Sequence, residues 1–294
     1  MNHVKRIVQA EEVYRRGYTG KGVRIAVLDT GVYAHRDIVK RVVFFKNYMG
    51  KRQTYHDDNG HGTHVAGILC GDGSISHGVV RGMAPGAELV VFKVLDKDGN
   101  GKTEKVLEAL KWIQKYHMEY KIRLLNFSVG FLQGAENDAQ EEIIRSLEQL
   151  WDENVTVVTA AGNNGPGEGS ITVPGISRKV ITVGACDDEQ GGRSMPKGYS
   201  GKGPTGCCIV KPEILAPGTN IVSLSNKGNQ YVPKSGTSMA TPIVCGALAL
   251  ALEKNPALRP ENLKLKLYES LVPGRERKGP AWGILQVDNL MKLI

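Results

Sequence analysis

Short apolar runs rich in β-branched residues alternate along this chain with segments whose apolar residues recur at helical spacing. The runs cover residues 23–28, 88–95, 124–129, 155–161 and 180–185. Between them, residues 103–116 and 139–151 repeat apolar side chains as one face of a helix does. Strands that alternate with helices predict a parallel sheet covered on both faces. We therefore expect an α/β fold with three layers, α/β/α, around a central, mostly parallel sheet.

The chain is interpreted as one domain. Nothing in its 294 residues resembles a linker, a repeat or a low-complexity tract, and this length suffices for one large core. We assign residues 1–294 to a single domain. Residues 239–252 are apolar on nearly every side, which predicts a buried helix. Ser238 would then lie at the N-terminus of that helix, where free N–H groups favour negative charge.

Charge and cysteine content narrow the partners and the compartment. Lys and Arg number 38 and Asp and Glu 30, a net charge of +8, but the basic residues are scattered and no nucleic-acid motif accompanies them. We expect no nucleic-acid partner and, without a long apolar segment, no membrane partner. The five cysteines lack a zinc-type spacing and fit reduced thiols in a cytoplasm. The alternative is a secreted protein whose signal and propeptide lie outside this sequence.

Asp29 closes the first apolar run, in the segment AVLDTG (Ala26–Gly31). The segment predicts a strand that ends in a tight turn, and open parallel sheets place their sites at the carboxyl ends of strands. Asp-Thr-Gly also occurs in aspartic-protease sites and in plain turns. This segment alone therefore leaves the role of Asp29 open.

Two histidines, His61 and His64, lie in NGHGTHVAG (Asn59–Gly67). A zinc pair on a helix normally has a spacing of four with a Glu between, so we expect no metal here. One interpretation is a general-base histidine at the start of a helix, with glycines leaving room for substrate. The other is a pair of turn or packing histidines.

Ser238 lies in SGTSMATP (Ser235–Pro242), after a Gly-Thr turn and at the start of the expected buried helix. That position suits a nucleophile, although a lone serine there is commonly only an N-cap. A further segment, TAAGNNG (Thr159–Gly165), ends a strand in a turn rich in Gly and Asn. Asn163 in this turn could donate a hydrogen bond to a developing oxyanion.

Together these segments resemble the subtilisin-like serine proteases (the subtilase family, peptidase family S8), and most of all its intracellular bacterial forms. The order Asp, His, Asn, Ser is the order of that family. AVLDTG, HGTHVAG, AAGN and GTSMATP are similar to its signature segments. Similarity extends through most of the chain, for example in KPEILAPG (Lys211–Gly218). The resemblance implies a subtilisin-like fold and a serine endopeptidase.

The resemblance also implies roles for individual residues. Ser238 would be the nucleophile, His61 its general base and acid, and Asp29 the group that orients His61. The Asn163 side chain and the Ser238 N–H would form the oxyanion hole, and His64 would be structural. A dedicated processing protease for peptide precursors and a peptide-binding pseudoprotease are the alternatives.

Substrate subsites are implied in the same way. Ser128, Val129 and Gly130 would form one wall of the pocket for the residue before the scissile bond (P1), and Ala161 and Gly162 the other. Asn164 stands where many relatives carry an acidic or polar residue. Because this chain has no carboxylate at that position, the resemblance implies a neutral or apolar P1 side chain. Asn100 and Gly101 resemble the cleft edge that pairs with a peptide as an added strand.

No cofactor is expected for catalysis. Many relatives bind calcium through an Asn-rich loop after the His helix, but residues 71–81 here lack a clear form of that pattern. Asp37 matches one calcium-ligating position, and one ligand does not make a site. Structural calcium is thus possible but not favoured. Peptides or proteins are the expected partners, and the oligomeric state is left open.

Overall fold

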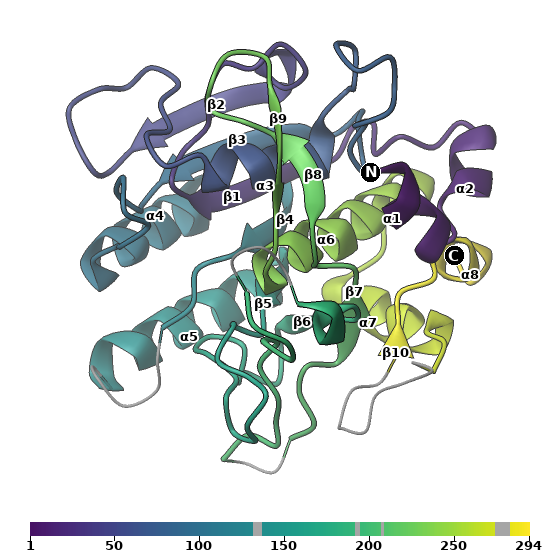
Figure 1. Ribbon diagram of the computed structural model, residues 1–294. Coiled ribbons are helices and arrows are strands. Elements are labelled where there is room, and N and C mark those ends of the chain that lie inside the picture. The colour runs from purple at the N-terminus through teal and green to yellow at the C-terminus, as the bar shows by residue number, and fades with distance from the viewer. Residues whose placement is uncertain (132–136, 192–194, 207–208, 274–282) are drawn as a thin grey trace.

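A computed structural model describes residues 1–131, 137–191, 195–206, 209–273 and 283–294. Its central sheet has eight strands in the order β10-β7-β6-β5-β4-β1-β3-β2 (Figure 1). All neighbouring strands in it run parallel. The strands are β1 (Arg24–Asp29), β2 (Val42–Asn47), β3 (Glu88–Lys93), β4 (Ile122–Phe127), β5 (Thr156–Ala160), β6 (Ile181–Ala185), β7 (Ile214–Ala216) and β10 (Gly283–Ile284).

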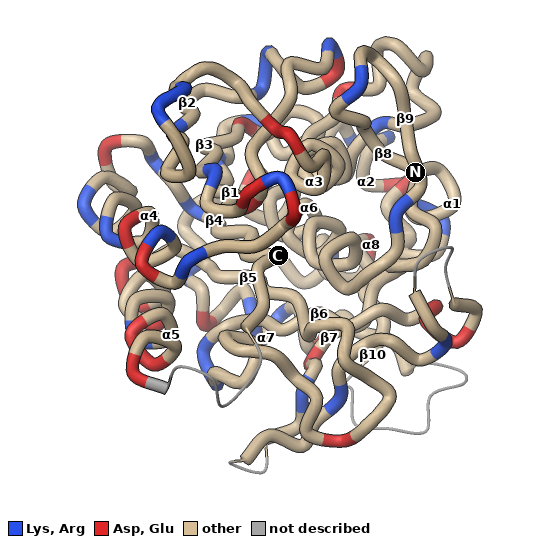
Figure 2. Tube along the Cα trace, turned by 60° about the vertical axis from the view of Figure 1, so that its left-hand side comes forward, with Lys and Arg blue, Asp and Glu red and all other residues tan. Residues whose placement is uncertain are grey.

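Helices cover both faces of this sheet. On one face, α3 (His61–Cys70) packs against α6 (Thr237–Lys254), and on the other α4 (Thr103–Tyr116) packs against α5 (Asn137–Asp152). Figure 2 shows α4 and α5 on one side of the strands and α3 and α6 on the other. The predicted α/β/α fold with a central parallel sheet is therefore confirmed.

The remaining elements lie around this framework. An antiparallel hairpin joins β8 (Ile221–Leu224) to β9 (Tyr231–Lys234) and contacts α3. The other helices are α1 (Asn2–Ile7), α2 (Glu11–Arg15), η1 (Val39–Arg41), η2 (Asp188–Gln190), α7 (Pro260–Ser270) and α8 (Val287–Lys292). In the described part of the chain, no helix combines the length and apolar character required to cross a membrane.

All five predicted sheet strands form, within two residues of their expected ends. The sequence did not indicate β7 and β10, which are three and two residues long, too short for a periodic signal. It also missed β2, the edge strand, whose central residues are only partly buried. Cys207 and Cys208 lie outside the described residues.

The predicted buried helix is α6. It begins at Thr237, so Ser238 is its second residue. Nearly every later position up to Leu252 is buried, because α6 lies between the sheet and α3. Pro242 lies in the second turn, where its missing N–H falls opposite the carbonyl of Ser238.

The strand order fixes where a site can form. β1 lies between β3 and β4, so the chain leaves β1 toward one side of the sheet first and the other side later. At such a switch point the connections diverge and leave a crevice at the carboxyl ends of the strands. Asp29 is the last residue of β1 and so lies at this edge.

Candidate active site

Asp29 and His61 form a hydrogen-bonded pair. The Oδ1 atom of Asp29 lies 2.7 Å from Nδ1 of His61, and it also accepts the N–H of Thr30 at 2.7 Å. The Asp29 side chain is fully buried, whereas a quarter of the His61 side chain is exposed. A buried carboxylate on Nδ1 holds the imidazole with Nε2 as its free nitrogen.

A second carboxylate, Asp57, places His61 at the start of α3. Its Oδ1 accepts the N–H of Gly60 at 2.7 Å and the hydroxyl of Thr30 at 2.9 Å, and its Oδ2 accepts the N–H of Thr63 at 2.9 Å. These bonds satisfy free N–H groups at the helix start and fasten it to the residue after Asp29. Asp57 has no local signature in the sequence, because its partners come from two separate elements.

Close backbone contact completes this attachment. A Cβ atom on Gly62 would lie 2.2 Å from the carbonyl oxygen of Gly31, which no ordinary packing allows. The glycine therefore lets α3 approach the end of β1 closely enough for its first residue, His61, to reach Asp29.

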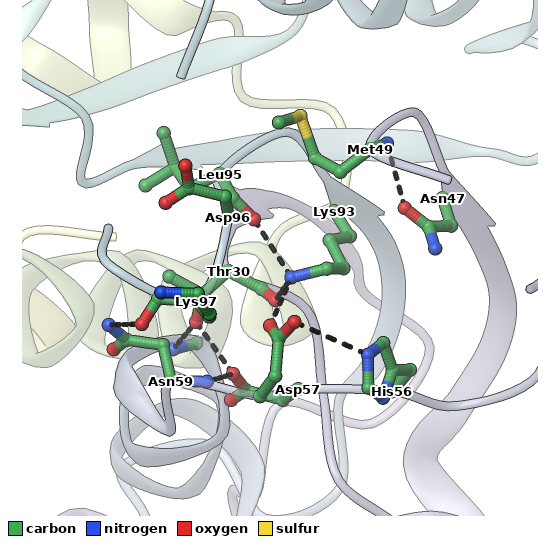
Figure 3. A network of polar contacts seen from close by, with 12 residues as sticks. Thr30, Asn47, Met49, His56, Asp57, Asn59, Lys93, Leu95, Asp96 and Lys97 are labelled. Carbon is green, nitrogen blue, oxygen red and sulfur yellow. Dashed lines mark hydrogen bonds and ion pairs between the residues drawn. The ribbon is translucent and has the colours of Figure 1, made fainter. Parts of the chain in front are cut away.

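A buried lysine fixes the loop after Asp29 from the other side. Figure 3 shows the Lys93 side chain between Thr30 and Leu95, to whose carbonyl oxygens its Nζ donates at 2.7 and 2.8 Å. The same Nζ donates to Oδ1 of Asp58 at 2.6 Å. Three acceptors satisfy its three donors, so a buried charge here is fully compensated.

Opposing influences set the protonation of the two histidines. Burial lowers the pKa of His61, but the charge and hydrogen bond of Asp29 outweigh that effect, so the pKa is raised overall. Lys234 opposes the rise and Asp57 adds to it. Burial lowers the pKa of His64 to about 3. Nε2 of His64 lies 3.0 Å from the carbonyl oxygens of Ile221 and Val232, so this ring fastens α3 to the β8–β9 hairpin.

Ser238 and Asn163 line one cavity of about 310 Å³ at the N-terminus of α6. The N–H and hydroxyl of Thr237 donate to Oδ1 of Asn163 at 2.9 and 3.0 Å. These bonds orient the amide, and Nδ2, its donor atom, can then donate to a substrate oxygen. The Thr237 hydroxyl in turn accepts the N–H of Gly162 at 3.2 Å.

The expected P1 pocket residues fall into two groups. Ser128, Gly130, Gly162 and Asn164 line the same cavity, together with Ala160, Thr172 and Thr237. Val129 and Ala161 are not among its lining residues and are buried. Thr172 and Thr237 are lining residues that no sequence pattern indicated.

Asn100 and Gly101 lie elsewhere, in the connection from β3 to α4. The carbonyl of Asn100 accepts the N–H of Asp96 at 2.8 Å, which closes a turn. Asn59 donates from Nδ2 to the carbonyl of Lys97 at 3.0 Å and so ties this turn to the segment before α3.

The structure thus brings Asp29 to His61 and Ser238 to Asn163. No hydrogen bond between His61 and Ser238 is formed among the described residues. The two halves belong to neighbouring helix starts, because α3 and α6 pack together on one face of the sheet. Bonds between base and nucleophile are often long without substrate.

Asp37, the single residue that matched a calcium position, is buried and paired within the protein. Its Oδ1 accepts the hydroxyl of Ser74 and the N–H of Ile75, both at 2.9 Å. Its Oδ2 accepts the hydroxyl of Tyr231 at 2.7 Å. Among the described residues, no group of three or more His, Cys, Asp or Glu side chains could hold a metal ion.

The fold and the site together define a class: α/β proteins with a serine-hydrolase type of site. The fold is a parallel sheet between two layers of helices. The site combines an Asp–His pair at the carboxyl edge of the sheet with a serine at the start of a neighbouring buried helix. Within that class, the chain belongs to the subtilase family (Peptidase_S8), which it matches over residues 20–282.

Individual relatives agree with this assignment. Serine protease AprX of Bacillus subtilis (strain 168) is 40% identical in an alignment 277 positions long, which covers 87% of this chain and 63% of AprX. The Intracellular serine protease of Paenibacillus polymyxa is 32% identical over 90% of this chain and 77% of its own length. The solved structure of Sphericase aligns with a TM-score of 0.81 at 29% identity, over 97% of both chains. The chain spans less than two thirds of AprX, as the 63% coverage shows.

Proposed function

We propose that this chain is a serine endopeptidase that hydrolyses peptide bonds through an acyl-enzyme on Ser238. One observation carries the proposal: the buried Asp29 carboxylate bonds His61 Nδ1 at 2.7 Å, at the edge of the sheet where Ser238 and Asn163 line a cavity. Membership of the subtilase family supports it.

In the first half-reaction, the Ser238 hydroxyl attacks the peptide carbonyl carbon while Nε2 of His61 takes its proton. The carbonyl oxygen becomes an anion that accepts bonds from Asn163 Nδ2 and the Ser238 N–H. Asp29 stabilises the imidazolium and stays ionised. The C–N bond then breaks, and His61 gives its proton to the departing amine.

In the second half-reaction, water replaces the amine. His61 removes a proton from the water, whose oxygen attacks the acyl carbon, and the oxyanion forms again in the same place. The C–O bond to Ser238 breaks, Ser238 recovers its proton from His61, and the acid product leaves. Atoms and charges balance without a cofactor.

The P1 residue is proposed to be neutral. The lining residues of the 310 Å³ cavity carry hydroxyl, amide or small side chains and no charge. A charged P1 side chain would lose its hydration there without a partner. Asn100 and Gly101 are proposed as the cleft edge that pairs with the substrate backbone.

Labelling with a fluorophosphonate tests the chemistry. The wild type should be labelled and should cleave casein, Ser238→Ala should do neither, and His61→Ala should be labelled far more slowly. Labelling of Ser238→Ala at the wild-type rate would overturn the assignment. Peptide binding without cleavage by the wild type would indicate a pseudoprotease, and cleavage of few peptides but not casein would indicate a dedicated processing enzyme.

Two further properties are proposed. The protein acts in the cytoplasm, which the relative named Intracellular serine protease supports, as do the thiols of Cys70 and Cys245, both buried and free. Asp37 does not hold a calcium ion, because protein donors already satisfy both of its oxygens, and structural calcium is not favoured. Fractionation of the source cells tests the first property, and thermal unfolding with a chelator tests the second.

A further inference from the structure

A second cavity, of about 320 Å³, lies next to His61. One wall is formed by Asn59 and Gly60, the two residues that precede His61. The other wall is formed by the hairpin segment 225–234, which ends four residues before Ser238. The cavity therefore lies between the two pieces of chain that lead into the histidine and the serine.

The proposed reaction places the leaving group of the substrate on the His61 side of Ser238, where the second cavity lies. The cavity with Ser128, Gly130 and Asn163 receives the acyl half of the substrate, because the oxyanion forms at Asn163. The departing amine takes its proton from His61, so the peptide attached to that amine extends on the His61 side. The first residues of that peptide can therefore reach the second cavity, whose wall includes Gly60.

The charge of this second cavity differs from that of the first. Lys227 and Lys234 line it with the amides of Asn59, Asn226 and Gln230, and no carboxylate is among its lining residues. Within the described part of the chain, neither lysine forms an ion pair. Lys234 is half-buried and acts electrostatically on His61, which places its charge close to the reacting groups.

Two buried carboxylates beside this hairpin bond other groups and form no ion pair with these lysines. Asp57 is buried and accepts hydrogen bonds on both oxygens from the start of α3 and from Thr30. Asp37 is likewise occupied by Ser74, Ile75 and Tyr231. Both carboxylates thus hold the fold together, and Lys227 and Lys234 line the cavity without pairing with either of them.

The walls of the cavity are held in place before substrate arrives. Asn226 donates from Nδ2 to the carbonyl of Asp57 at 3.1 Å, which fixes the hairpin to the segment before α3. The ring of His64 bonds the carbonyl of Val232 at 3.0 Å. A pocket fixed in this way loses less entropy when it binds a side chain.

We propose that this cavity, with Lys227 and Lys234, binds an acidic side chain within the first few residues after the scissile bond. The inference rests on the proposed endopeptidase function and gives it a substrate class: peptides with Asp or Glu within the first three residues after the scissile bond.

Internally quenched peptides test the proposal. All share one acyl half, and each carries Glu, Gln or Lys at one of the first three positions after the scissile bond. In the wild type, kcat/KM should be highest for Glu at one position, by about two- to fivefold over Gln for each lysine engaged, as expected for partly exposed charge pairs. The preference should shrink at high salt, because both charges are partly solvated.

Lysine variants identify the groups responsible. Lys234→Gln and Lys227→Gln should each lower the Glu-to-Gln ratio, and Lys234→Glu should favour Lys-containing peptides instead. Because each ratio is taken within one variant, a change in overall activity cancels. Lys21→Gln is the matched control, since Lys21 precedes β1 at the opposite edge of the sheet and is exposed.

A substrate with the same acyl half and a p-nitroanilide leaving group separates this proposal from the proposed function. If neither that substrate nor fluorophosphonate reacts, the endopeptidase assignment fails. If the anilide is cleaved but Glu, Gln and Lys peptides react equally at all three positions, the acidic-substrate proposal is wrong and the endopeptidase stands. A Glu preference that persists unchanged in both lysine variants would also overturn it.

Discussion

Replacing Thr237 by valine should weaken the proposed oxyanion hole without changing Asn163, which supplies its side-chain donor. The Thr237 hydroxyl donates to Oδ1 of Asn163 at 3.0 Å and accepts from the N–H of Gly162 at 3.2 Å. Valine has the same shape and removes both bonds. The backbone N–H of Thr237 still donates to Oδ1 at 2.9 Å, so one of the two bonds that orient the amide remains.

The expected size follows from what one hydrogen bond contributes. A neutral hydrogen bond contributes about 1 kcal/mol net, which corresponds to a loss of roughly three- to tenfold in kcat if it all acts in the transition state. Removing the Asn163 amide itself should cost about a hundred- to a thousandfold, a range measured in subtilisin, a member of the same family. Thr237→Val should therefore lower kcat far less than Asn163→Ala, with little change in KM.

The loss of a buried partner should also lower stability. With valine in place, the N–H of Gly162 loses its acceptor, which costs about 1–3 kcal/mol in the free energy of unfolding. Rates are therefore measured well below the midpoint of thermal unfolding, with active sites counted by fluorophosphonate titration. Thr237→Ser, which keeps the hydroxyl, is the matched control and should retain most of kcat.

A double-mutant cycle decides whether Thr237 acts through Asn163. In the Asn163→Ala background there is no amide left to orient, so Thr237→Val should change kcat by less than about twofold. An equal loss in both backgrounds would refute the reasoning, as would a Thr237→Ser variant as slow as Thr237→Val.

Three shorter predictions concern protonation, burial and metal. Because Asp29 raises the pKa of His61, kcat/KM should rise with pH through a pKa above the ordinary histidine value of about 6.5. Asp29→Asn should move this rise of the pH–rate profile to lower pH and abolish most activity. Lys211→Met removes the 2.6 Å partner of the buried Glu213 carboxylate and leaves it Lys264 at 3.1 Å. The loss should cost about 1.5–3 kcal/mol in chemical denaturation, part of which Glu213→Gln recovers, and an unchanged midpoint would contradict this. Excess EDTA should leave the thermal midpoint within about 1 °C, and a large fall would reveal a bound stabilising ion.

The parts of the site that sequence could predict are those with a local signature. Asp29 ends a β-branched run and Ser238 begins a helix that is apolar all round, so each position follows from its neighbours. His61 could be placed at a helix start for the same reason. The family resemblance then indicated that these segments form one site, which hydrophobic periodicity alone cannot indicate.

The parts that sequence could not predict depend on tertiary contacts. Asp57 is one of two adjacent aspartates in a loop, and only the folded chain distinguishes its buried carboxylate from the more exposed Asp58. Lys93 reads as one polar residue at the end of a strand, yet it is buried with three acceptors. The pocket walls were predicted only in part, because Thr172 approaches Gly130 and Gly162 from a distant segment.

The burial of α6 has a consequence for how this molecule fails under heat or denaturant. Its amides lie between the sheet and α3, so they can exchange with solvent only when the central layers separate. The Ser238 hydroxyl thus belongs to a helix whose body opens only with the central layers, whereas Asn163 lies in a half-buried turn outside that helix. Loss of turnover should therefore occur no later than global unfolding, and molecules that are still folded should digest unfolded copies of the same chain.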